Sequence, residues 1–420
     1  MMLETIKKKI LKMGCEIWEI TENTARGWEF YFIRHRLDQN RLTEVRTFDV
    51  TLYRPLEGEM LGAASGQISP TASAEEVQKT LEDLWFQASL VKNPAYGLQD
   101  APVPQPEIPE VNLEQISGDF IRTMKDLPET PGEDINSYEI FVREITRHFL
   151  NSRGVEYVCR YPSSMIEVIV NARRGDHEIE LYRAFHSGNC DAQKLREEIG
   201  KAMVYGRDRL TAEPTPRLGT FDVLFSTDDS TAIYRYFSDR TNAAMIYRKL
   251  SDWNVGKNIG CGLSLRAVPQ LENSSRNDPV DEEGSLIRDR FLIRDGKVEN
   301  IWGARQFSQY LQVENSSLVH NFIVSGGTRS EEEIRKGDYL EIVEFSDFQV
   351  DSMSGDIAGE IRLGYLHQGG KVTIVSGGSV SGQMAEMIPD MQFSRETAQY
   401  DRYVVPRVTL LRGLRITGVR

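Results

Sequence analysis

The stretch "GYLHQGGKVTIVSGGSVSGQ", residues Gly364–Gln383, decides the fold of the C-terminal half. A Gly-Gly pair stands between two runs rich in β-branched and aromatic residues, which is typical of a tight turn between antiparallel strands. We therefore predict a hairpin that turns at Gly369 and Gly370. The later glycines and serines predict a loop with exposed backbone at residues 376–383.

The same stretch approaches two catalytic motifs and matches neither. A phosphate-binding loop needs a lysine directly after its second glycine, but Gly370 stands between Gly369 and Lys371. A nucleophile elbow needs the pattern G-x-S-x-G, but Ser381 occupies the place of the second glycine after Ser379. A structural turn is therefore favoured over a catalytic loop.

Working outward, most of the C-terminal half alternates like strands, with turn residues between the runs. The strand candidates lie within residues 285–302, 336–351, 359–375 and 406–419. One amphipathic helix is expected from Ser230 to Leu250, with its apolar face formed by Ile233, Phe237, Met245 and Leu250. These patterns predict an α+β protein whose C-terminal domain, 213–420, is a large antiparallel sheet or barrel with one central helix.

The N-terminal region, 1–212, contains a weak repeat of helix, strands and helix, which predicts a mixed or antiparallel sheet. The first unit, about 1–92, has helices near 3–13 and 73–90, and Ser73 with Glu76 forms a candidate capping box. Its strand candidates are 15–20, 28–37 and 42–54.

The second unit, about 137–212, follows a connection with five prolines from Pro94 to Pro109. Such a segment cannot form regular helix and is expected to run extended over the surface. The unit is predicted to begin with a helix at 137–154 and to end with one at 191–210, capped by Asp191. Strands are expected between them, at 155–161, 165–174 and 177–185.

Composition excludes several classes of function. The formal net charge of -13 argues against phosphate-neutralising nucleic-acid binding, and no apolar run approaches the length of a membrane span. The N-terminus has no signal-peptide pattern, so a cytoplasmic location is expected. The four cysteines are far apart and lack metal-ligand spacing, which predicts reduced structural thiols at Cys15, Cys159, Cys190 and Cys261.

The histidines and acidic clusters give no catalytic constellation. His177 opens the sequence "HEIEL", but the pattern of a zinc-binding helix fails at Leu181 and falls in a strand candidate. His148 has no evident nucleophile partner. The acidic segments around Asp228 and Asp281 are predicted to be turns or helix caps, and Asp295 with Gly296 a hairpin turn.

The segment 320–383 resembles the PmbA/TldD family, once called modulators of DNA gyrase and regarded as metallopeptidases. The resemblance rests on a two-glycine turn, "SEEE", "YLEI", "SGDIAGE" and "GSVSG", in matching order. Upstream, residues 279–302 look like the family's "D-x-EG" hairpin. The resemblance spans most of the chain and is strongest from about residue 217 onward.

The resemblance also implies that this chain lacks the zinc ligands of TldD-type members. TldD-type members carry H-E-x-x-x-H on the central helix and a cysteine ligand in the C-terminal sheet. Here the central helix has neither histidine nor glutamate, and Cys261 precedes the ligand-bearing region. The chain is therefore similar to the TldE or PmbA side of the family, and no zinc or other cofactor is expected in it.

By resemblance, such a chain is a non-catalytic subunit or paralogue of a metallopeptidase that acts in proteolysis or maturation of unfolded peptides. The expected partner is a TldD-like catalytic subunit, which would hold the zinc, or a second copy of the chain in a homodimer. No membrane contact and no direct nucleic-acid binding are expected. Candidate residues for a peptide cavity are Tyr234, Asp281, Glu283, Gly326, Gly327, Gly359, Ser379 and Ser381.

Two alternatives remain open. The first is a hydrolase that uses Ser379 or Ser381 with His367 or His320. The second is a homodimeric peptide-binding protein that acts without a catalytic partner. For the non-catalytic, peptidase-related function, exposed sheet edges would let a peptide bind as an added strand.

Overall fold

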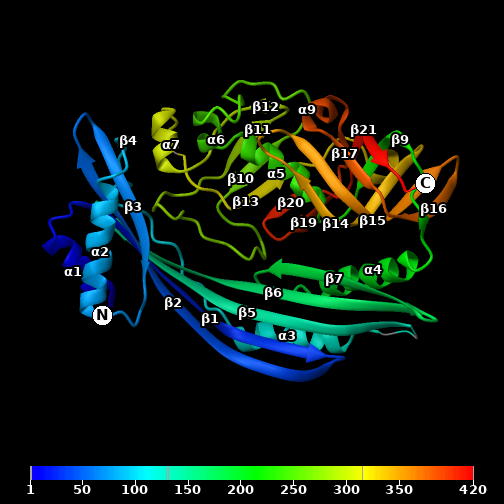
Figure 1. The fold of residues 1–420 in the computed structure, drawn as a ribbon, viewed down its shortest axis with the longest axis horizontal. Coiled ribbons are helices and arrows are strands. Elements are labelled where there is room, and N and C mark those ends of the chain that lie inside the picture. Colours follow the sequence, from blue (N-terminus) through cyan, green and yellow to red (C-terminus); the bar gives the residue numbers. More distant parts are fainter. Residues whose placement is uncertain (1, 129, 131, 315, 420) are drawn as a thin grey trace.

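The computed structural model describes residues 2–419 except 129, 131 and 315. Figure 1 shows a long, curved sheet from the first half of the chain lying below a β-rich C-terminal region. Helices cover parts of the long sheet, and α4 (Ala192–Arg209) runs between its end and the C-terminal region.

The long sheet has seven strands in the order β4-β3-β2-β1-β5-β6-β7, and every neighbouring pair is antiparallel. The two central strands pair from Glu19 opposite Asn151 to Ile33 opposite Ser137. The strands of the first segment, β1 to β4, and those of the second, β5 to β7, therefore form one continuous sheet. The strands are β1 (Ile17–Ile33), β2 (Arg36–Leu56), β3 (Met60–Ile68), β4 (Asn93–Pro94), β5 (Glu133–Asn151), β6 (Glu156–Arg174) and β7 (His177–Ser187).

Each half of this sheet is covered by two helices. α1 (Met2–Lys12) and α2 (Ala74–Ala88) bury Ile6, Ile10 and Leu81 against strands β1 to β3. α3 (Leu113–Lys125) and α4 enclose a second core on strands β5 and β6. The predicted helix caps are confirmed, because Ser73 and Glu76 form a capping box and Asp191 accepts a hydrogen bond from the backbone of Lys194.

The helix predicted at 137–154 is wrong, because this segment is strand β5. Tyr138, Ile140 and Val142 are fully buried at alternate positions, and the strand pairs on both sides, with β1 and β6. Alternation and pairing on two edges outweigh the weak helical spacing of the segment. The helix that opens this half is α3, capped by Asn112 beyond the proline-rich connection.

The C-terminal region contains a closed five-stranded barrel, as the barrel-like prediction expected. Around the barrel, β14 pairs with β9, β9 with β21, β21 with β17, β17 with β15, and β15 again with β14. Its strands are β9 (Gly219–Phe225), β14 (Tyr339–Val350), β15 (Asp356–Gln368), β17 (Ser379–Gln383) and β21 (Thr409–Thr417). Three short strands attach to it, namely β8 (Glu213–Pro214), β16 (Lys371–Ser376) and β18 (Gln392–Phe393).

A six-stranded sheet completes this region, in the order β12-β11-β10-β13-β20-β19. It shares one large core with the barrel and with helix α5 (Ser230–Arg240), in which Phe225, Phe237 and Leu265 are fully buried. The mixed α+β class is confirmed by this arrangement. The strands are β10 (Leu265–Val268), β11 (Arg290–Arg294), β12 (Lys297–Val298), β13 (Asn321–Val324), β19 (Thr397–Tyr400) and β20 (Tyr403–Pro406).

Both predicted hairpin turns are confirmed. Gly369 and Gly370 have φ values of 59° and 77° and join β15 to β16, and Asp295 with Gly296 joins β11 to β12. The loop with exposed backbone at 376–383 is wrong. After a turn at Gly377 and Gly378 the chain forms β17, which pairs with β15 and β21 and closes the barrel.

The single central helix is in fact two helices, α5 (Ser230–Arg240) and α6 (Ala243–Tyr247). The break follows Thr241, where the Asn242 side chain caps α6 and the backbone N–H of Ala243 donates to the carbonyl of Trp302 at 2.7 Å. Ile233 and Phe237 are buried as expected, whereas Leu250 is 39% exposed. The remaining short helices are α7 (Arg305–Tyr310), α8 (Glu331–Ile334), α9 (Met384–Met387) and η1 (Ile388–Asp390).

Candidate functional site: an interdomain cleft

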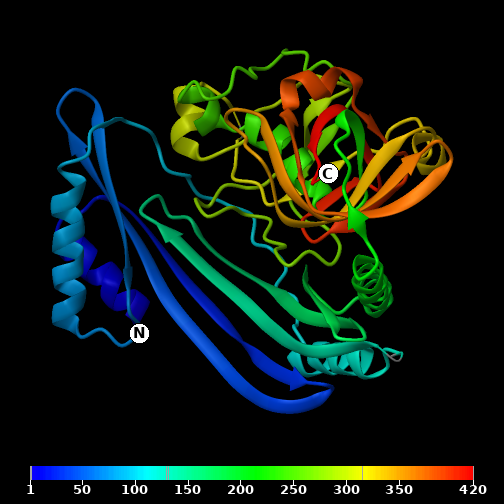
Figure 2. The same ribbon diagram turned by 45° about the vertical axis from the view of Figure 1, so that its right-hand side comes forward.

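A cleft of about 1710 Å³ lies between the long sheet and the C-terminal region. One wall consists of β7 and α4, and the other of β19, β20 and the start of α5. Figures 1 and 2 show that these elements come from distant parts of the sequence. The cleft therefore exists only when both regions are folded and packed together.

Two strand edges border this cleft. β7 is the last strand of the seven-stranded sheet and β19 the last of the six-stranded sheet, and each pairs with one neighbour among the described residues. Residues 184–187 of β7 and 397–400 of β19 line the cleft. An edge strand carries N–H and C=O groups that its sheet leaves unpaired, so both walls offer backbone groups to an extended ligand.

The cleft carries charges of both signs together with aromatic surface. Such a lining does not select strongly for one sign of ligand charge. Its acidic residues are Asp191, Glu197, Glu198, Asp228, Glu272, Glu331, Glu341 and Asp401. Its basic residues are Lys194, Lys201, Arg235, Arg276, Arg335, Arg402 and Arg407, and its rings include Phe185, Tyr205 and Tyr400.

Burial shifts the pKa values of several groups at this site. The Lys194 ammonium donates to the Gln399 carbonyl and lies 5.4 Å from the centre of the Tyr400 ring, and burial lowers its pKa. For an acidic group the effect of burial is the opposite, and burial raises the pKa of Asp228. Burial and the neighbouring Asp228 carboxylate raise the pKa of Asp229 to about 6. The carboxyls at the start of α5 therefore take up protons more readily than ordinary aspartates.

Specific contacts hold the two walls in place. Arg183 on β7 forms an ion pair with Glu344 on β14. The Tyr365 hydroxyl on β15 donates to Asp208 of α4 at 2.8 Å. These contacts fix the edge of the long sheet against the barrel, so the width of the cleft is set by side chains of both regions.

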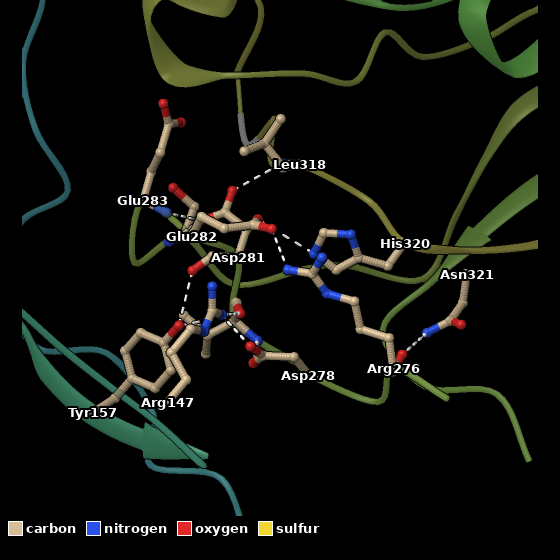
Figure 3. A network of polar contacts seen from close by, with 12 residues as sticks. Arg147, Tyr157, Arg276, Asp278, Asp281, Glu282, Glu283, Leu318, His320 and Asn321 are labelled. Carbon is tan, nitrogen blue, oxygen red and sulfur yellow. Dashed lines mark hydrogen bonds and ion pairs between the residues drawn. The ribbon is translucent and has the colours of Figure 1, made fainter. Parts of the chain in front are cut away.

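A buried polar network joins the two regions beside the cleft (Figure 3). Arg147 of β5 forms an ion pair with Asp278, and both side chains are almost completely buried, with exposed fractions of 5% and 0%. Arg147 also donates to the Val280 carbonyl and lies 5.4 Å from the centre of the Tyr157 ring. The Tyr157 hydroxyl donates to the carbonyl of Asp281 at 2.9 Å. The long sheet thus holds the segment 278–285 through charge and backbone contacts.

Asp281 and Glu283 organise this segment internally. The Asp281 carboxylate accepts hydrogen bonds from the backbone N–H groups of Glu283, Ser285 and Leu318. Glu283 accepts one from the backbone of Arg305. Burial, together with neighbouring carboxylates, raises the pKa of both groups to about 7.

Glu282 connects the network to the cleft. It forms an ion pair with Arg276, which lines the cleft, and its Oε2 lies 3.3 Å from Nε2 of His320. Burial disfavours ionisation of Glu282, but His320 and Arg276 outweigh it and hold the pKa of Glu282 below its ordinary value. Figure 3 shows these three side chains pointing toward one another.

The eight residues proposed from sequence lie outside the lining of this cleft. Tyr234 is fully buried in the C-terminal core, where its hydroxyl contacts Thr409 at 2.6 Å. Gly326 and Gly327 allow the chain to pass close to the backbone of residues 393–395, and at Gly359 a Cβ would meet the ring of Phe345 at 2.9 Å. Asp281 and Glu283 lie in the network described above. A role in peptide contact for any of them stays a prediction.

The serines and histidines of the alternative hydrolase site are not brought together. Ser379 pairs opposite Glu360 on β15, whereas His367 lies seven residues further along the same strand. At about 3.3 Å per residue, this places them about 23 Å apart along the strand. His320 contacts Glu282 in the network, and Ser381 is exposed on β17. This geometry does not favour a Ser-His nucleophile at these positions.

The described residues contain no group of three or more His, Cys, Asp or Glu side chains placed to hold a metal ion. The four cysteines are free, and burial raises the pKa of each thiol, to about 12 for Cys159 and about 11 for Cys190. No described helix is long and apolar enough to cross a membrane.

The cleft residues were not identified from the sequence. Lys194, Phe185 and Tyr400 come from three separate elements, and none of them stands in a recognisable motif. What marks the cleft is the position of β7 and β19 as the last strands of their sheets. That signal requires strand order, which the sequence pattern alone does not supply.

Comparison with known proteins agrees with the architecture. Residues 218–418 match the family model described as the PmbA/TldA metallopeptidase C-terminal domain. No curated protein matches the chain in a sequence search.

Solved structures similar to the whole chain share its fold at low sequence identity. A putative modulator of a DNA gyrase from Thermotoga maritima has a TM-score of 0.79 at 14% identity, with 99% of this chain and 100% of that chain covered. TldE from Thermococcus kodakarensis has a TM-score of 0.76 at 16% identity, with 99% and 100% covered. A putative modulator of DNA gyrase from Bacteroides thetaiotaomicron has a TM-score of 0.78 at 15% identity, with 99% and 98% covered.

Proposed function

Because the C-terminal domain of this chain, residues 218–418, belongs to the PmbA/TldD metallopeptidase family, we propose that the chain binds unfolded peptides as a non-catalytic, TldE-like member. A peptide would lie extended in the interdomain cleft. The chain would present or shape this peptide for cleavage in a TldD-like partner, which would carry the zinc. A cytoplasmic location is part of the same proposal.

The observation that carries the proposal is the pair of open strand edges on the cleft. An extended peptide can add to β7 or β19 through backbone hydrogen bonds, which do not depend on its sequence. The mixed charges of the lining are consistent with this mode of binding, because a ligand recognised by its backbone needs no matching sign of charge.

The absence of a catalytic role for this chain is proposed from the sequence of the two central helices. α5 and α6 contain neither histidine nor glutamate, so a metal-binding helix with a glutamate base cannot form there. Cleavage would then require the partner.

The proposal is tested with the purified full chain, zinc and a fluorescently labelled unfolded polypeptide. We expect the polypeptide to bind, as measured by fluorescence anisotropy, and to stay intact by mass spectrometry. Addition of a TldD-like catalytic chain should start cleavage. Hydrolysis by the chain alone that a chelator abolishes would contradict the non-catalytic role.

Two cleft-filling variants test the binding site itself. Ala184→Trp on β7 and Ala398→Trp on β19 place an indole ring in the cleft and should weaken peptide binding at least about tenfold, since they occupy the space beside each edge. The matched control is Ala385→Trp, an exposed alanine of α9 outside the cleft lining. Equal affinity in all three variants would place the peptide elsewhere.

A further inference from the structure

The half-buried side chain of Lys194 spans the cleft from one wall to the other. It starts on α4, and its ammonium donates to the backbone carbonyl of Gln399 on β19. Figure 1 shows α4 beside the end of the long sheet and β19 within the C-terminal region. One lysine therefore ties a helix of the first wall to the edge strand of the second.

The register of the β19–β20 hairpin shows that this carbonyl belongs to the open edge of β19. Opposed residues of an antiparallel pair alternate between those that exchange hydrogen bonds and those whose backbone groups point outward. Thr397 lies opposite Pro406, which has no N–H, so these two residues cannot exchange hydrogen bonds. Gln399, two residues further along and opposite Val404, is of the same kind. Its N–H and C=O groups therefore point away from β20, to the side where an added strand would pair.

Contacts that do not involve Lys194 hold the Gln399 carbonyl in place. The Gln399 side chain donates to the carbonyl of Glu272 at 2.7 Å and to that of Asp401 at 2.9 Å. The Asp401 carboxylate in turn accepts hydrogen bonds from the backbone N–H and the hydroxyl of Ser275, each at 2.9 Å. The edge of β19 therefore keeps its shape when the lysine side chain moves.

Carboxylates on both walls surround the Lys194 ammonium. Asp191 and Glu198 lie three residues before it and four residues after it, the spacing at which side chains on a helix meet. Asp228 at the start of α5 and Asp401 after β19 act on the same charge from the opposite wall. Burial lowers the pKa of Lys194, whereas these four carboxylates favour its charged form. Lys194 can therefore leave the Gln399 carbonyl and still have a counter-ion within reach.

We propose that the contact between Lys194 and the Gln399 carbonyl is a latch on the β19 edge, which a peptide must open to bind there. In the free chain the ammonium occupies the carbonyl, and a bound peptide takes over that carbonyl through a backbone N–H and moves the lysine to the neighbouring carboxylates. The latch rests on the proposed peptide binding in the cleft. Since a backbone hydrogen bond replaces the one that the lysine loses, the latch lowers the affinity without preventing binding.

The test compares full-length variants in their binding of a labelled unfolded polypeptide, measured by fluorescence anisotropy. Lys194→Met removes the donor and keeps a long side chain, so it should bind about three- to tenfold more tightly than the wild type. Lys194→Arg keeps a charged donor and should bind more weakly than Lys194→Met. Arg196→Met is the matched control, because it removes one positive charge from an exposed position of the same helix outside the cleft lining, and it should bind like the wild type.

Hydrogen exchange of the free chain gives a second measurement that needs no peptide. Exchange in residues 397–400 should be faster in Lys194→Met, because β19 loses its tie to α4, and unchanged in Arg196→Met. If no variant binds the polypeptide, the peptide-binding proposal fails, whereas an exchange difference confined to Lys194→Met still supports the latch. Binding by Lys194→Met that is equal to or weaker than that of the wild type, or unchanged exchange in residues 397–400, would overturn the latch.

Discussion

The buried ion pair between Arg147 and Asp278 gives the sharpest test of how the two regions are held together. The Asp278→Asn variant keeps the hydrogen bond that Asp278 accepts from the Val280 backbone at 3.1 Å, but it removes the negative charge. The guanidinium of Arg147, 5% exposed, then stays buried without a counter-ion. Leaving one charge of a buried pair uncompensated costs about 3–5 kcal/mol.

The remaining contacts of Arg147 place the expected loss near the lower end of that range. Its hydrogen bond to the Val280 carbonyl and its position over the Tyr157 ring both survive in the variant, so we expect the free energy of unfolding to fall by about 3 kcal/mol. Arg147→Met should cost a similar amount, because it leaves Asp278 charged and buried. The double variant Arg147→Met/Asp278→Asn removes both charges and should cost less than either single variant.

The assay is urea unfolding followed by circular dichroism, with hydrogen exchange in residues 278–285 as a local readout. Glu299→Gln is the matched control, since it breaks the exposed pair with Arg294 and should cost at most about 1 kcal/mol. A free energy of unfolding for Asp278→Asn within about 1 kcal/mol of the wild type, or a double variant that loses the sum of both single losses, would contradict this role of the buried pair.

Two further predictions concern the same junction. Gly284→Ala should lower the free energy of unfolding by about 1–3 kcal/mol more than the control Gly58→Ala, as measured in urea titrations. Both glycines have positive φ, but only at Gly284 would a Cβ lie 2.7 Å from the Phe149 ring. Equal losses in the two variants would contradict this prediction. Burial raises the pKa of Glu19 and of Asp281 to about 7, so the folded state binds more protons than the unfolded state below that pH, and stability should fall as pH rises from the ordinary carboxyl range to about 7 and then level off. Glu19→Gln should flatten that dependence in urea titrations at several pH values, and an unchanged slope would show that Glu19 does not titrate in this range.

Local signals in the sequence predicted local structure well. The turns at Gly369 and Gly370 and at Asp295 and Gly296 follow from residue types that tolerate positive φ, so no tertiary information is needed. The capping box at Ser73 is equally local, since donor and acceptor lie three residues apart. The barrel-like C-terminal region followed from repeated strand patterns between such turns.

Features that depend on long-range pairing were not predictable in the same way. Strand β5 carries spacing that also fits a helix, and only its two partners, β1 and β6, decide between them. The break at Thr241 depends on Trp302, about sixty residues away in the sequence. Likewise, the cleft lies between two edge strands, and which strands are edges depends on the strand order of each sheet. The glycines and serines chosen from family motifs therefore lie outside the cleft lining.

Peptide binding at the cleft is tested most directly by hydrogen exchange of the full chain with and without an unfolded polypeptide. If a peptide adds to the open edges of the cleft, exchange should slow in residues 184–187 of β7 and 397–400 of β19, because backbone N–H groups that the two sheets leave unpaired gain partners. Residues 36–47 of β2 serve as an internal control and should show no change on peptide addition. Unchanged exchange at both cleft edges in the presence of bound polypeptide would contradict strand addition in the cleft.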